Sequence, residues 1–322
     1  MSSPTPFLLT GVTGGLGHKI LHEMLHTHHV CPQDIIATSR SPSKRSHYES
    51  QNLQFRIADY KDPSSLLSAF ANVRDLLFMS SSERDNATRN AEHRNVIEAA
   101  KKTGVQKVWY VSLAFGGWED TSKIGFQQAH YETENLLKES GLEFVSLRAG
   151  VYSDAFPLFL NWYPESKEVL FPKVEPPVEE SRIAFTSREE LGEGIATLLV
   201  KGGVEPKGEK RIVLLTASET NSLVELVEAI DAELPVRYLD PKDWIEESAK
   251  DDIGGKGKAW FEARLVFTEG VCKGDAAVMD PALEKLLGRK PETGVQAVRR
   301  LIQEAGEKGY RWHQNHVNGK GM

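Results

Sequence analysis

The chain has 322 residues and a formal net charge of −7, and its composition is 40% hydrophobic and 26% charged. These are values of an ordinary globular protein, and the negative charge argues against a protein that coats nucleic acid. No apolar run approaches the roughly 20 residues that span a bilayer, and the N-terminus lacks the basic region of a secretory signal. We expect a cytoplasmic protein with no direct nucleic-acid or membrane partner.

Short apolar runs alternate with amphipathic segments through the first 150 residues. The runs that predict strands are 7–10, 35–38, 53–58, 76–79, 108–111 and 144–147. Helix-like segments lie between them, among them 95–102 and 127–140. Strands that alternate with helices indicate a parallel sheet covered on both faces. The sequence therefore predicts an α/β fold with a Rossmann-type, doubly wound parallel sheet.

This alternation stops after Gly150. Residues 151–181 are rich in aromatic side chains and proline, which indicates irregular structure. Residues 188–200 and 211–216 predict a helix and a strand that return to the first layer. Further helices are expected at 222–232, 242–250, 257–267, 281–287 and 292–306. The C-terminal part is therefore expected to be smaller and mainly helical.

A glycine-rich segment follows the first predicted strand and opens the first predicted helix. Glycine lets the chain turn sharply and lets a pyrophosphate approach the backbone at the positive end of the helix. A P-loop would end in Gly-Lys-Ser/Thr, which is missing here. The segment predicts a dinucleotide-binding turn, and the plain alternative is a strand–helix turn without a ligand. The residues expected at the dinucleotide are Gly11, Thr13, Gly14, Gly15, Leu16 and Gly17.

The end of the second predicted strand bears on which dinucleotide binds. NAD sites usually have Asp or Glu there, bonded to the ribose 2′-hydroxyl, whereas this chain has Arg40, with Lys44 close behind. A guanidinium can pair with the 2′-phosphate of NADP, so the sequence favours NADP(H) unless Arg40 is only a solvated surface charge. The ends of the third and fourth strands add Asp59, Met79, Ser80 and Ser81 to the expected cofactor site.

Taken together, these residues resemble the NmrA-like branch of the atypical short-chain dehydrogenases/reductases. Besides the glycine turn and Arg40, the resemblance rests on segments 95–105, 130–134, 147–150, 187–191 and 286–291. That family includes NADPH-dependent quinone and phenylpropanoid reductases and a redox-sensing transcription regulator. The resemblance implies an NADP-binding Rossmann domain and a substrate region. The NADP-binding domain would comprise residues 1–153 and be completed by about 182–217. The substrate region would comprise residues 154–181 and 218–322.

The usual catalytic pair of short-chain dehydrogenases is missing at its expected place. These enzymes use a serine and then Tyr-x-x-x-Lys on one helix face; Ser112 fits the serine, but Phe126 and His130 stand at the pair positions. Histidine can transfer a proton near neutral pH. We therefore expect Ser112 and His130 to be catalytic. The alternative is that His130 only lines the pocket or hydrogen-bonds the cofactor amide.

Aromatic side chains after the fifth predicted strand are expected to wall the substrate pocket. They are Phe115, Trp118, Tyr131, Tyr152, Phe156 and Trp162. Flat rings suit a planar aromatic substrate, although for any one of them a place in the core is the common alternative. His18, His22 and His26 lie opposite the apolar face of their predicted helix, so no metal site is expected.

The sequence thus predicts an NADPH-dependent oxidoreductase, a monomer or homodimer, that passes hydride to a small aromatic or quinone-like acceptor. His130 would orient the substrate or relay a proton. One alternative is an NADP-binding redox sensor without turnover, which the missing tyrosine and lysine favour. Another is a non-redox enzyme, such as a cyclase, that uses the same cleft with His130 or the acids Asp120, Glu132 and Glu134.

Overall fold

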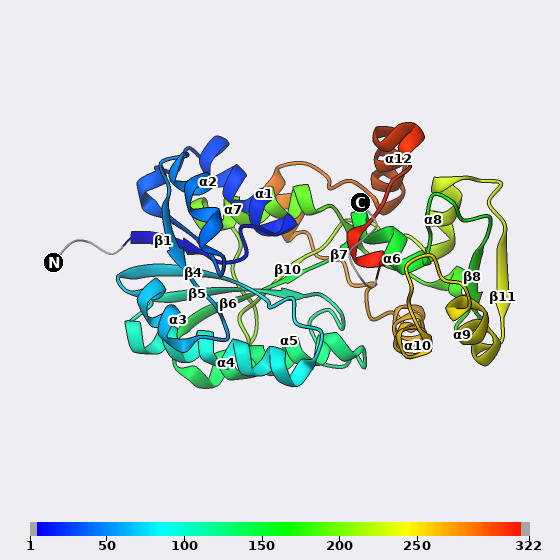
Figure 1. Ribbon diagram of the computed structural model, residues 1–322, viewed down its shortest axis with the longest axis horizontal. Coiled ribbons are helices and arrows are strands. Elements are labelled where there is room, and N and C mark those ends of the chain that lie inside the picture. The colour runs from blue at the N-terminus through cyan, green and yellow to red at the C-terminus, as the bar shows by residue number, and fades with distance from the viewer. Residues whose placement is uncertain (1–4, 317–322) are drawn as a thin grey trace.

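The computed structural model describes residues 5–316, and its centre is a seven-stranded parallel sheet with helices on both faces (Figure 1). The strands are β1 (Thr5–Leu9), β2 (Ile35–Ser39), β3 (Gln54–Ile57), β4 (Val73–Met79), β5 (Lys107–Leu113), β6 (Glu143–Ala149) and β10 (Ile212–Leu215). They lie in the order β10-β6-β5-β4-β1-β2-β3, so the strand order reverses between β1 and β4. The predicted doubly wound, Rossmann-type fold is confirmed.

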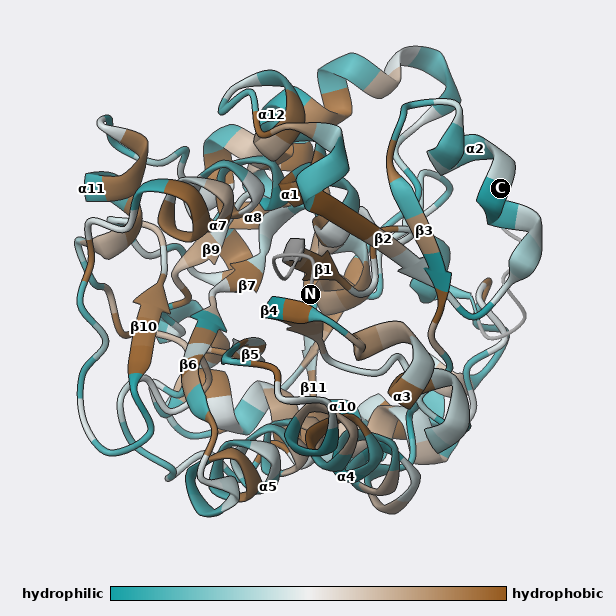
Figure 2. Cartoon of the chain, turned by 90° about the vertical axis from the view of Figure 1, so that its left-hand side faces the viewer, coloured by the Kyte–Doolittle hydropathy of each residue, from teal (hydrophilic) through white to brown (hydrophobic). Residues whose placement is uncertain are grey.

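Alternate side chains of the central strands point to opposite faces of this sheet. Leu9 and Leu77 belong to a buried cluster with α1 (Gly15–His26) and α7 (Arg188–Lys201). Leu8 and Leu76 belong to another with α3 (Pro63–Phe70) and α4 (Asn86–Thr103). The first layer also holds α2 (Arg45–Glu49), and the second holds α5 (Gly125–Ser140). Figure 2 shows hydrophobic strands enclosed by helices whose outer faces are hydrophilic.

The helices that flank the cavity described below have clear end signals. The Asp85 side chain accepts a hydrogen bond from the Thr88 backbone N–H at 2.8 Å and caps the start of α4. Gly104 and Gly141, both in the left-handed conformation, end α4 and α5. Such caps satisfy backbone groups that a helix end would otherwise leave unpaired. The Asp85 cap fixes where the loop that follows β4 enters α4.

A smaller part of the chain lies beyond the carboxyl ends of the sheet strands (Figure 1). It contains α6 (Phe156–Leu160), α8 (Leu223–Ile230), α9 (Pro241–Ala249), α10 (Lys258–Cys272) and α12 (Gly294–Ala305). The sequence predicted the last four of these helices in order. It did not predict the parallel pair β8 (Val169–Pro172) and β11 (Val236–Leu239). Phe156, Phe171 and Phe267 belong to the buried core of this part.

Two further pieces join the sheet to the smaller part. Strand β7 (Val151–Tyr152) follows directly after β6 and forms a second parallel pair with β9 (Phe185–Thr186). Helix α11 (Ala282–Leu287) falls within the range predicted for the smaller region, yet its Leu283 packs with Leu191 and Ile195 against the sheet. Short 3₁₀ turns lie at 32–34, 42–44, 153–155, 178–180, 306–308 and 313–315. Among residues 5–316, no helix is long and apolar enough to cross a membrane.

Candidate active site

A cavity of about 1290 Å³ opens at the carboxyl ends of the central strands and extends to α10. Its walls come from the loops after β1, β2, β4 and β5, from α5, α6 and α10, and from residues 312–314. It lies at the switch point of the strand order, where open α/β sheets bind their ligands. Of the described residues, six Arg or Lys and three Asp or Glu side chains line it, so this wall is positively charged although the whole chain carries −7.

The glycine turn is built for a close approach of a ligand to the backbone. Gly11 has a φ of +66°, and a Cβ there would lie 2.7 Å from the Met79 side chain. A Cβ on Gly17 would lie 2.3 Å from the Gly11 carbonyl oxygen, so glycine lets α1 pack directly onto the turn. All six residues predicted for this turn line the cavity, and the first turn of α1 carries no acidic residue. This arrangement fits a pyrophosphate at the helix N-terminus.

The other residues predicted for the cofactor also line this cavity. They are Arg40, Lys44, Asp59, Met79, Ser80 and Ser81. Arg40 and Lys44 are exposed at the end of β2, where a 2′-phosphate can reach them. The Ser81 backbone N–H donates to Nε2 of His93 at 2.9 Å, and Nδ1 of His93 lies 2.7 Å from the Thr133 hydroxyl. Through His93 and Thr133, helices α4 and α5 therefore hold the loop after β4 in place.

Sequence reasoning missed a cation directly above the glycine turn. Arg188 begins α7, and a Cβ on Gly15 would lie only 1.9 Å from its Nη1 atom. Its Nε donates to Asp154 Oδ2 at 2.5 Å, and its guanidinium carbon lies 4.5 Å from the Trp312 ring centroid. Burial raises the pKa of Asp154 despite this neighbour. The segment 187–191, which carries part of the family resemblance, is the signal that could have placed this arginine at the ligand.

The His130 side chain lines the cavity but is only 4% exposed. Its Nδ1 lies 2.8 Å from the hydroxyl of Tyr110, whose pKa is raised by burial. Burial, followed by the charge of Arg89, holds the pKa of His130 well below its usual 6.5. The ring is therefore neutral at physiological pH. A neutral imidazole can donate one hydrogen bond to a ligand, but it does not act as a charged acid.

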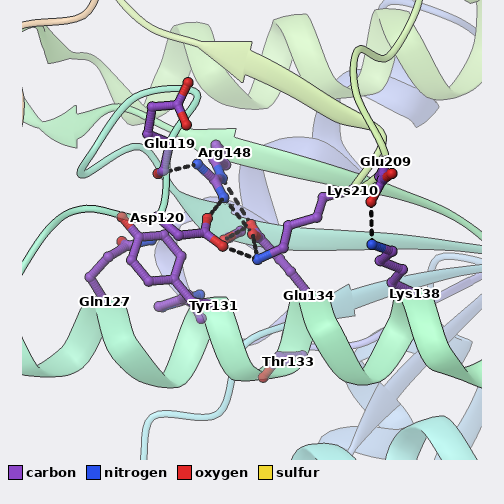
Figure 3. A network of polar contacts seen from close by, with 12 residues as sticks. Glu119, Asp120, Gln127, Tyr131, Thr133, Glu134, Lys138, Arg148, Glu209 and Lys210 are labelled. Atoms are coloured by element: carbon purple, nitrogen blue, oxygen red, sulfur yellow. Dashed lines mark hydrogen bonds and ion pairs between the residues drawn. The ribbon is translucent and has the colours of Figure 1, made fainter.

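Ser112 lines the cavity with its hydroxyl already engaged. Its Oγ donates to Glu134 Oε1 at 2.7 Å, so only its oxygen lone pairs remain for a ligand. Glu134 also accepts from Arg148, through Nε at 3.0 Å and Nη2 at 2.6 Å (Figure 3). Arg148 Nη2 further donates to Asp120 at 2.8 Å, and Lys210 closes the network on Asp120. This buried network ties the loop after β5 to α5 and β6.

The three acids named for non-redox chemistry do not line the cavity. Asp120 and Glu134 belong to the network around Arg148, which lowers the pKa of Asp120 even though partial burial raises it. Glu132 is half-buried and lies 3.8 Å from Arg94 at the surface. In the described part of the chain, no group of three or more His, Cys, Asp or Glu side chains is placed to hold a metal ion.

Two of the six predicted pocket aromatics, Phe115 and Tyr152, line the cavity. The other four do not, because each packs elsewhere. Trp118 lies under the ammonium group of Lys207, and Tyr131 donates its hydroxyl proton to the Phe115 carbonyl at 2.6 Å. Phe156 and Trp162 pack on each other, with ring centroids 5.6 Å apart, in the core of the smaller part.

The cavity wall is completed by rings that the sequence did not assign to it. They include Phe126, Phe159, Trp260, Phe267 and Trp312. The rings of Phe159 and Phe267 are stacked at 5.3 Å, and Phe115 meets both Phe126 and Phe267 edge to face. The result is a continuous aromatic surface that joins the end of β5 to α10. Flat apolar ligands suit such a surface.

Comparison with known proteins agrees with this geometry. A family model described as NAD(P)H-binding matches residues 11–161. The NmrA-like family domain-containing oxidoreductase flvB of Aspergillus flavus is 41% identical over 314 residues, 96% of this chain and 98% of that protein. Quinone oxidoreductase 2 of Escherichia coli is 40% identical over 148 residues, 46% of this chain and 49% of that protein.

A solved structure extends the similarity to the fold. The crystal structure of the NADPH-dependent quinone oxidoreductase QOR2 from Escherichia coli, complexed with NADPH, matches with a TM-score of 0.75. It is 29% identical, and the match covers 92% of this chain and 99% of that chain. Because the Aspergillus relative matches along nearly the full length of both proteins, the expected family is confirmed. This chain belongs to the NmrA-like family of oxidoreductases and carries an NAD(P)H-binding domain.

Proposed function

We propose that this protein is an NADPH-dependent reductase that transfers hydride to a small aromatic or quinone-like acceptor. The observation that carries the proposal is one cavity with the glycine turn in its wall and a continuous aromatic surface facing it. Both reactants of a hydride transfer fit in such a space, and holding them together supplies much of the catalysis. The resemblance to a quinone oxidoreductase supports the acceptor class.

The cofactor site fits NADPH through groups that oppose its negative charges. In this proposal the turn from Gly14 to Gly17 binds the pyrophosphate, with Arg188 beside it, and Arg40 and Lys44 bind the 2′-phosphate. Asp59 accepts from the adenine amino group at the end of β3. When bound, NADPH supplies a hydride from its nicotinamide ring. The chain binds and orients the reactants.

His130 positions the acceptor, whereas Ser112 ties the end of β5 to Glu134 on α5. The neutral imidazole donates a hydrogen bond to an acceptor oxygen through the ring nitrogen that does not face Tyr110. Ser112 can only accept, because its own proton is bonded to Glu134. Hydride transfer to a quinone then needs one proton to give the hydroquinone, and it comes from water or through the His130–Tyr110 pair.

Titration with NADPH, NADP⁺, NADH and NAD⁺, followed by NADPH absorbance in the presence of a neutral para-quinone, tests the proposal. We expect both NADP forms to bind more tightly than the NAD forms, and the quinone to be reduced. Binding of NADP⁺ alone without turnover would instead support a redox sensor. An acceptor transformed at constant NADPH absorbance would support a non-redox enzyme.

A cytoplasmic location and a monomeric or homodimeric state stay predictions.

A further inference from the structure

Helix α10 brings a positive charge into the aromatic end of the cavity. Arg264 is 9% exposed, lines the cavity and donates one hydrogen bond, from Nη2 to the Leu158 carbonyl at 2.9 Å. Its guanidinium carbon lies 4.3 Å from the ring centroid of Phe267, 5.0 Å from that of Trp260 and 5.4 Å from that of Phe159. Within residues 5–316, no carboxylate forms an ion pair with this side chain. The rings hold the guanidinium in place without neutralising it.

The other buried Lys and Arg side chains within the described part of the chain are neutralised. Arg148, which is fully buried, bonds to both Glu134 and Asp120. Lys256, which is also buried, lies 3.3 Å from Asp252. Burying a charge without a partner is costly, so an exception needs a reason. Burial lowers the pKa of Arg264 to about 9, and the group is therefore still a cation at neutral pH.

The position of Arg264 relates this charge to the acceptor and not to the nucleotide. The ring of Phe267, which lies under the guanidinium, is 5.8 Å from that of Phe115, just after β5. The acidic side chains of the cavity wall are Asp59, Asp85 and Glu92, which come from the loop after β3 and from the start and first turns of α4. Helices α6 and α10 contribute none. The acceptor end therefore carries an uncompensated positive charge.

We propose that the acceptor carries a carboxylate, which Arg264 binds while the aromatic ring of the acceptor packs against Phe159, Trp260 and Phe267. This inference rests on the proposed function, because it names the acceptor class of the same site. A guanidinium offers a planar fork of N–H donors that matches a carboxylate in a bidentate pair. The carboxylate is not reduced: it orients the ring, and hydride and proton go to the quinoid part of the molecule as before.

Matched acceptors test this inference. Reduction of a carboxylated quinone and of its methyl ester is compared in the wild type, Arg264→Met and Arg264→Lys. Arg94→Met, at an exposed position on α4, is the control. We expect the wild type to prefer the acid by about tenfold or more in kcat/KM, as charge-assisted pairs are strong. Arg264→Met should lose this preference while still reducing the ester, and Arg264→Lys should retain part of it.

Equal kcat/KM values for acid and ester in the wild type would overturn the inference, as would an equal loss for both in Arg264→Met. The ester separates this result from the proposed function, since its reduction does not need Arg264. If neither quinone is reduced, the proposed function fails. Calorimetric titration of the NADP⁺-loaded protein with 2-naphthoate and 2-naphthamide then tests Arg264 alone. Binding of the acid only, lost in Arg264→Met, supports the carboxylate site, and equal binding of both refutes it.

Discussion

Replacing Glu134 with alanine is expected to destabilise the protein, because it removes the main neutralising partner of a fully buried guanidinium. Arg148 donates to Glu134 through two nitrogens, at 3.0 and 2.6 Å, and Ser112 donates to the same carboxylate at 2.7 Å. In Glu134→Ala these donors lose their acceptor in a place that water does not reach. Asp120 stays 2.8 Å from Arg148, but its side chain is 40% exposed.

The size of the effect follows from this geometry. Removing one partner of a buried ion pair costs about 3–5 kcal/mol, because the other charge stays buried without compensation. Since Asp120 remains, we expect the lower end, about 3 kcal/mol. Unfolding entropy is about 2.1 cal/mol/K per residue, so over 322 residues the same change lowers Tm by about 4 °C.

Urea unfolding of the wild type, Glu134→Ala and Glu132→Ala measures this difference. Glu132 lies on the same helix, but its ion pair with Arg94 is exposed and 3.8 Å long, so its loss should cost under about 0.5 kcal/mol. Arg148→Met and the double variant with Glu134→Ala complete a cycle whose coupling we expect at about 1–3 kcal/mol. A Glu134→Ala cost no larger than that of Glu132→Ala would refute the reasoning.

Three further predictions follow from the site and its surroundings. Arg40→Ser should weaken NADPH binding about tenfold and leave NADH binding nearly unchanged, since an exposed charge-assisted bond contributes about 1–2 kcal/mol; calorimetry with both nucleotides measures this. Gly17→Ala puts a Cβ 2.3 Å from a backbone carbonyl oxygen and should cost about 1–3 kcal/mol of unfolding free energy and weaken NADPH binding, whereas Gly125→Ala meets no atom within 4 Å and should do neither. Burial lowers the pKa of His93 to about 3 and holds that of His130 well below 6.5, so below about pH 6.5 the unfolded chain binds protons that the folded protein does not. The free energy of unfolding should therefore fall as the pH is lowered from 6.5 to 5, by up to about 1.4 kcal/mol per pH unit for each of the two histidines. Urea unfolding measures this, and a free energy that stays constant over this pH range would contradict it.

The central sheet could be predicted because its strands are buried on both faces and appear as apolar runs, such as the unbroken run 76–79 in β4. The β8–β11 pair could not. Each of these strands has four residues, β8 ends in a proline, and the two are separated by more than sixty residues of chain. Nothing local in either segment indicates its partner, so residues 151–181 were predicted to be irregular.

The candidate site, like the fold, contains residues that the sequence could place and residues that it could not. The glycine turn, Arg40 and Ser80 could be found because a strand end places them at a known edge of the sheet. The rings of Phe159 and Phe267 meet only because α6 packs on α10, and in the sequence Phe267 is one more apolar residue of a helix. Conversely, residue type alone predicts Trp118 and Phe156 in the wall. Phe156 instead lies in the core of the smaller part, and Trp118 packs, partly buried, under Lys207.

Arg148 and Arg264 look alike in the sequence, because each is a single arginine in a mostly apolar segment. They differ in the side chains that contact them in the structure. The chain has 46 acidic residues against 39 basic ones, so carboxylates are not scarce. Arg148 has two of them and is part of the scaffold, whereas Arg264 has three aromatic rings and an open cavity. In an acidic protein, a buried cation without a carboxylate is best explained by a ligand that brings one.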